Sequence, residues 1–140
     1  MVDFEYLQKG IAGLANAHPL GTMSGHLGAA VTAGYFIGED HGDLSVTISR
    51  GIESELDRVL KGEEAIWFDV KKTGTKPSQL FATGPKQAAV PDRIQNIAAA
   101  LAENVATLKQ SGHNVIFASI AIRALRSHEQ YATPWAIDGI

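Results

Sequence analysis

Two long segments with almost no charge constrain the fold of this chain most strongly. Residues 27–37 contain no charged side chain, and residues 115–125 contain only Arg123. Both segments have the length of a helix, but both are shorter than the roughly 20 apolar residues that a membrane helix needs. The same tripeptide, Ser-Gly-His, precedes each of them, at residues 24–26 and 111–113. The pattern predicts two core helices whose first turns are alike.

Most of the remaining chain also has the hydrophobic spacing of helices. Apolar residues recur at intervals of three and four in residues 4–16, 44–59 and 94–108, and no stretch keeps the alternation of a strand for long. We therefore expect helix from about residue 4 to 61 and again from about 92 to 126. Expected N-cap residues are Asp3, Asp43 and Thr133, with Pro134 in the first turn of a last short helix. The predicted fold is all-α, a helical-hairpin bundle of about five to six helices forming a single domain over residues 1–140.

The helices are of two kinds. Residues 25–37 and 113–125 are small or apolar nearly all round, which is typical of inner helices, whereas residues 44–59 and 94–108 carry a single apolar stripe. This order of inner and outer helices, together with the two Ser-Gly-His segments, resembles the α/α-toroid enzymes. In that family, inner helices line a cavity and catalytic groups gather at one rim. A closed toroid needs more helices than these, so the resemblance implies a partial toroid and a fragment of a longer protein. A simple bundle is the alternative.

Composition limits the classes of partner and chemistry. The formal net charge is -3 and no aromatic-rich basic stripe is present, so we expect no nucleic-acid partner. The chain has no cysteine, which excludes disulfides, thiolate metal sites and thiol nucleophiles. The first residues show no basic region followed by an apolar one, and the prediction is a cytoplasmic protein without a membrane partner.

The repeated tripeptide supplies the first candidate site. Ser24 and Ser111 are expected to cap the two inner helices, which would place His26 and His113 in their first turns, with His18 in the preceding loop. The positive end of a helix dipole favours a neutral imidazole, which can act as a general base, bind a carbonyl or ligate a metal. Whether a metal or another cofactor binds is left open. The alternative is a pair of core histidines that each bond a backbone carbonyl.

A long connection at about residues 62–90 is rich in lysine. Residues 65–70 could form a short strand or a helical turn, and Lys71, Lys72, Lys76 and Lys86 face a single acid, Asp69. Loops of this length are uncommon in compact domains and are often lids or binding loops. We expect Lys72 and Lys76 to contact an anionic or carbonyl-bearing small molecule. A solvated loop is the alternative.

The opposite ends of the two inner helices supply a second candidate site. If these helices run parallel, their last turns also meet, about 20 Å from the first site at about 1.5 Å per residue. Carboxylates combined with histidine suit a divalent cation, although charged residues are also common in any exposed turn. The residues concerned are Glu39, Asp40, His41, Asp43, His128 and Glu129.

Two functional hypotheses follow. The first is small-molecule binding or histidine-based catalysis, with His26 and His113 as catalytic groups. The second is a non-catalytic oligomerisation module, because Trp135, Ile137 and Ile140 form an apolar face on a helix too short to be stable alone. We expect residues 71–90 or a second copy of the chain to cover that face, and the second case predicts a homo-oligomer. The chain has no dinucleotide, phosphate-loop, zinc-protease or nucleophile-elbow motif, so whether it is an enzyme stays open.

Overall fold

The computed structural model describes residues 1–63, 76–103 and 112–140. Regular secondary structure in these ranges is entirely helical, so the all-α prediction is confirmed. Three 3-10 turns within the described ranges, η1 (Thr22–Ser24), η3 (Pro91–Arg93) and η5 (Glu129–Tyr131), connect longer elements. The α-helices of the same ranges are α1 (Phe4–Ala15), α2 (Ala17–Leu20), α3 (Gly25–Asp40), α4 (Val46–Lys61), α6 (Pro77–Leu80), α7 (Gln95–Ala102), α8 (His113–Ser127) and α9 (Pro134–Gly139).

The closest approach between helices is that of α1 and α3. A Cβ atom added to Gly28 would lie 2.5 Å from the backbone nitrogen of Leu14, and one added to Gly13 would lie 2.8 Å from the Cα of Gly28. Glycine is required because any side chain at these positions would push the two backbones apart. The small residue Gly28 therefore lets the backbone of α3 lie close to that of α1.

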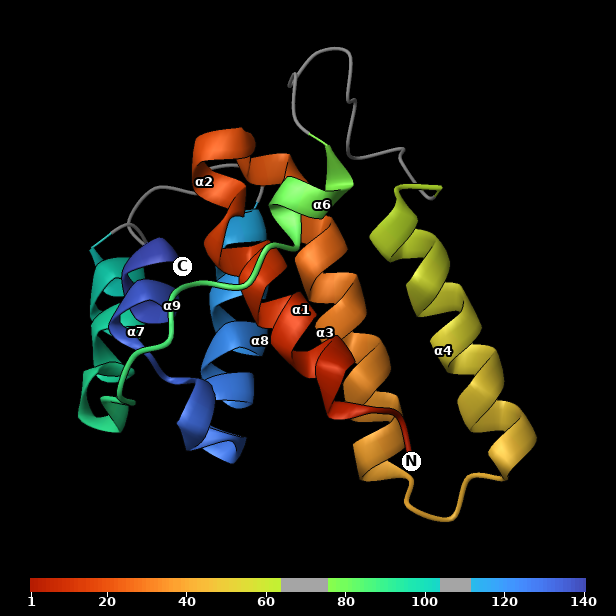
Figure 1. The fold of residues 1–140 in the computed structure, drawn as a ribbon. Helices are drawn as coiled ribbons and strands as arrows, with labels where there is room; N and C mark the ends of the chain where they lie inside the picture. Colours follow the sequence, from red (N-terminus) through yellow and green to blue (C-terminus); the bar gives the residue numbers. More distant parts are fainter. Residues whose placement is uncertain (64–75, 104–111) are drawn as a thin grey trace.

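Helix α8 packs beside α3 in the same direction, so both helices begin at one end of the bundle and finish at the other (Figure 1). Helix α7 packs against α8, and α4 lies on the outer side of α3. Leu56 is a close apolar contact between α4 and α3, because a Cβ atom added to Gly34 would lie 2.5 Å from the Leu56 side chain. The apolar stripe predicted for α4 is confirmed at Leu56, which is buried, and at Ile52 and Val59, which pack against the core clusters. It is wrong at Ile48, which is 52% exposed.

The expectation that the inner helices are enclosed is wrong for one face of each. On α3 the exposed residues Ala30, Ala33 and Ile37 lie three and four apart, so they share one face. On α8, Ile116 and Ser119 are exposed. An apolar sequence pattern alone did not distinguish a fully covered helix from one with an open apolar face.

The helix boundaries correct several details. Asp3 caps α1 by accepting from Glu5 N at 2.7 Å, and Thr133 caps α9 with Pro134 in its first turn, as predicted. The predicted cap Asp43 is wrong, because α4 begins later and Ser45 caps it. Helix α1 ends at Ala15, and His18 and Pro19 form part of α2. The helix expected from about residue 92 begins as η3 and continues as α7, and its predicted end, like residues 65–70, lies outside the described residues.

The C-terminal helix is covered by another part of the same chain. The segment that follows α6 crosses α1 toward α7 (Figure 1), and its Gly84 lies against the indole of Trp135. Ile137 is buried in the main core cluster, and Val90 N donates to Ala132 O at 2.8 Å. Residues 71–90 were one of the two covers predicted for the face of Trp135, Ile137 and Ile140. Of these residues Trp135 is contacted by Gly84 and Gln87 of that segment, whereas Ile137 and Ile140 pack with the core clusters. Among the described helices, none is both long and apolar enough to cross a membrane.

Candidate functional site

The two tripeptide histidines lie together, although 87 positions separate them in the chain. The centroids of the His26 and His113 rings are 4.7 Å apart, and the rings are inclined by 65°. Both side chains are half-buried at the end of the bundle where α3 and α8 begin. The Nδ1 atom of His26 lies 2.8 Å from Met23 O. Because a carbonyl oxygen only accepts, the Nδ1–H of His26 is the donor in this hydrogen bond.

The Phe117 ring packs against both histidine rings. Its ring centroid is 5.1 Å from that of His26 and 6.0 Å from that of His113. The first glycine of the repeat makes this packing possible, because a Cβ atom on Gly25 would lie 2.8 Å from the Phe117 ring. The second glycine has another role: Gly112 occupies the N-cap position of α8 with φ of 84°, a left-handed conformation that favours glycine. The glycine of the repeat is therefore needed for side-chain packing at Gly25 and for backbone conformation at Gly112.

The other residues predicted for this site do not join the pair in the part of the chain that the structure describes. Ser24 is wrong as a cap: it lies in η1 with helical dihedrals, and its buried hydroxyl donates to Gly21 O at 2.6 Å. Gly112 takes the cap position expected for Ser111. Ser111 and Lys72 lie outside the described residues. His18 is exposed on α2, and Lys76 is exposed at the start of α6.

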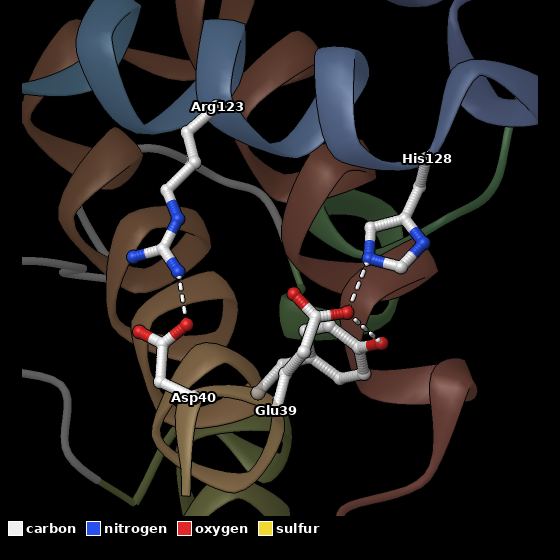
Figure 2. Close-up of polar contacts among 5 residues, drawn as sticks. Glu39, Asp40, Arg123 and His128 are labelled. Atoms are coloured by element: carbon white, nitrogen blue, oxygen red, sulfur yellow. Dashed lines mark hydrogen bonds and ion pairs between the residues drawn. The ribbon is translucent and has the colours of Figure 1, made fainter.

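The opposite ends of α3 and α8 also meet, as predicted for parallel helices. Figure 2 shows Arg123 of α8 and His128, which directly follows α8, pointing toward Asp40 and Glu39 at the end of α3. His128 Nε2 donates to Glu39 Oε1 at 2.6 Å, and the Tyr35 hydroxyl donates to the same oxygen at 3.1 Å. Arg123 forms an ion pair with Asp40. Two of the acids predicted as cation ligands, Glu39 and Asp40, are therefore paired with His128 and Arg123.

His128 lies among aromatic rings. The centroids of Phe4 and Tyr35 are 5.5 Å and 5.6 Å from that of His128, and only 11% of the His128 side chain is exposed. Burial raises the pKa of the Tyr35 hydroxyl, and the hydrogen bond to Glu39 raises it further. Arg123 lies 3.8 Å from the ring centroid of Phe36, which is a cation–π contact. This end of the bundle is a packed polar cluster rather than an open site.

No group of three histidine or acidic side chains could hold a metal ion, as far as the described residues show. His41, Asp43 and Glu129 are exposed and do not take part in the Glu39–His128 cluster. The cation hypothesis for this end is thus left without a ligand set in residues 1–63, 76–103 and 112–140.

A pocket of about 470 Å³ lies between α1, residues 83–87 and the start of α9. This pocket was not predicted from the sequence, although two of its residues were named there: Lys86 as part of the lysine-rich connection and Trp135 as part of the apolar face of the last helix. Its parts come from three separated segments, and no motif or spacing connects them. The side chains with aromatic or polar groups at its wall are Gln8, Thr83, Lys86, Gln87, Gln130, Tyr131, Thr133 and Trp135.

Comparisons with protein-family models, with curated protein sequences and with solved structures found no match to this chain.

Proposed function

We propose that this chain binds a small anionic or carbonyl-bearing molecule at the end of the bundle where α3 and α8 begin, with His26 and His113 as the polar contacts. The observation that carries the proposal is the 4.7 Å separation of the two ring centroids. Two half-buried imidazoles from distant parts of the chain are placed in one space on a rigid Phe117 support. Rigid support of this kind is what a binding or catalytic group requires.

The chemistry follows from the ring atoms. His26 keeps its Nδ1 proton on Met23 O, so its Nε2 can serve as a general base or, once protonated, as a donor to a carbonyl or carboxylate oxygen. The positive ends of α3 and α8 add a favourable potential for an anion. The resemblance to the α/α-toroid enzymes, in which groups at one rim act on substrate, stays a prediction that agrees with this placement.

Histidine-selective NMR tests the proposal. We expect inorganic phosphate, acetate or acetamide at millimolar concentration to shift the Cε1–H resonances of His26 and His113 together. The exposed His18 serves as an internal reference, and its resonance should not follow theirs. His26→Gln and His113→Gln should each weaken probe binding by about tenfold, the loss of one hydrogen bond to a charged group.

The matched control is His18→Gln, which removes a histidine outside the pair and should leave probe binding unchanged. If His26→Gln and His113→Gln both lower the free energy of unfolding while probe binding is retained, the two residues are core histidines and the proposal is wrong. Absence of any probe-dependent shift at either ring would equally reject it.

The exposed faces of α3 and α8 favour the oligomerisation module as a second candidate. Ala30, Ala33 and Ile37 continue the face that begins at His26, and Ile116 continues the face that begins at His113. These faces form an apolar strip between the histidine pair and the Asp40–Arg123 pair, suited to a helix of a second copy. Sedimentation should then show a dimer that Ile37→Lys converts to monomer, with Ile48→Lys, an exposed position on α4, as the control. A wild-type chain that sediments as a monomer would exclude this candidate.

A further inference from the structure

We propose that the pocket between α1, residues 83–87 and the start of α9 is a second ligand site, and that it takes a flat aromatic anion. This site is separate from the histidine pair: it shares no residue with it and does not depend on the proposed function above. Its volume of about 470 Å³ lies in the range of small-molecule sites, which are commonly 300–1,000 Å³.

The aromatic part of the ligand is matched by the walls. Trp135 and Tyr131 are both half-buried, so each ring has one covered part and one part at the pocket. Ala12 and Ala136 line the pocket as well and are buried, which leaves a floor of small apolar groups. Stacking on aromatic rings over an apolar floor selects a planar ligand.

Contacts within the chain fix the position of Trp135 in the absence of a ligand. Backbone atoms of Gly84 lie so close to the indole that a Cβ atom at this position would overlap it. The backbone nitrogen of Trp135 donates to Gln87 Oε1 at 2.9 Å, which attaches the helix start to the same segment. A preorganised aromatic wall reduces the entropy that a ligand must overcome on binding.

The charge of the lining selects an anion. Lys86 is exposed, forms no ion pair with a described residue, and is the one charged group among the described residues that line the pocket. Gln8, Gln87 and Gln130 add amide donors, and their side-chain NH₂ groups make no hydrogen bond to the described residues. A local positive charge with amide donors, in a chain of formal net charge -3, is suited to a carboxylate or phosphate group.

The experiment compares 2-naphthoate with 2-naphthalenemethanol, two probes of like shape that differ in charge. Binding is followed by the indole N–H resonance of Trp135. We expect both probes to shift this resonance and naphthoate to bind about fivefold more tightly, the gain from one partly solvated ion pair. The preference should disappear in Lys86→Met and return in Lys86→Arg.

Lys76→Met is the matched control, because it removes an exposed lysine near the same connection that does not line the pocket. It should keep the fivefold preference. The proposal is overturned if neither probe shifts the Trp135 resonance at millimolar concentration, if the two probes bind equally to the wild type, or if Lys86→Met keeps the preference. The histidine resonances report separately on the first site, so either site can fail without the other.

Discussion

The two ends of the α3–α8 pair use histidine in different ways. Where the helices begin, His26 and His113 contact each other, a phenylalanine and a backbone carbonyl. Where they end, His128 is hydrogen-bonded to the carboxylate of Glu39. A histidine hydrogen-bonded to a carboxylate of a neighbouring helix is suited to holding the two helices together. Two imidazole rings placed side by side are suited to contacting an acidic or carbonyl-bearing ligand, as proposed above.

The two ends also differ in whether their histidines are expected to serve the stability of the fold or the binding of a ligand. The cluster of Glu39, His128 and Tyr35 shares one carboxylate oxygen between two donors in partly buried surroundings. Removing one member leaves the others with unsatisfied groups, which costs more than the interaction itself contributed. The histidine pair is half-buried and rests on Phe117, so we expect its loss to affect ligands more than folding.

The largest expected effect is that of His128→Ala, which should lower the free energy of unfolding by about 2–3 kcal/mol. The change removes one of the two donors to the Glu39 carboxylate and opens a void beside Phe4 and Tyr35. Urea unfolding at neutral pH measures the loss. His26→Ala is the comparison and should cost about 1 kcal/mol or less. Equal losses for the two variants would show that both ends serve stability alike.

The next effect is that of Gly25→Ala, which should destabilise the fold by about 2 kcal/mol through overpacking against Phe117. The Cβ atom would lie 2.8 Å from that ring, so Phe117 and the His26 ring above it must move. Urea unfolding gives the loss, and the His26 Cε1–H resonance should shift. Gly51→Ala is the control, since nothing lies within 4 Å of its added Cβ in mid-helix α4, and it should stabilise by about 0.5–1 kcal/mol. An unshifted His26 resonance in Gly25→Ala would contradict this account of the repeat.

The smallest effect is that of Asp40→Asn, because the Asp40–Arg123 pair is solvent-exposed. The hydrogen bond from Arg123 holds the pKa of the Asp40 carboxyl below its usual range. A carboxyl whose pKa is lowered by folding contributes stability above its unfolded pKa and loses it as pH falls through the folded value. Thermal melting should therefore show a small loss for the variant at neutral pH and none in strong acid. Asp43→Asn, at an exposed acid outside the pair, should match the wild type at both.

The sequence pattern predicted most about the positions of the helices and about which helix ends meet. The three-and-four spacing predicted α1 and α4, and the two uncharged apolar segments predicted α3 and α8. The shared tripeptide identified His26 and His113 as a candidate pair before the structure showed that they are in contact. The N-cap predicted at Ser24 is wrong, because a serine before a helix also fits the last turn of η1. The pocket was not predicted, because Gln8, Lys86 and Trp135 share no periodicity in the sequence.

The sequence by itself determined the helical class, because local spacing of apolar residues and local caps such as Asp3 and Thr133 act within a few positions of the chain. Only the tertiary structure decided which faces of α3 and α8 stay open, which acid His128 binds and which segment covers Trp135. Those outcomes depend on the crossing of helices distant in the chain. That crossing is set by close contacts, such as Gly28 on Leu14 and Leu56 on Gly34, which no local pattern specifies.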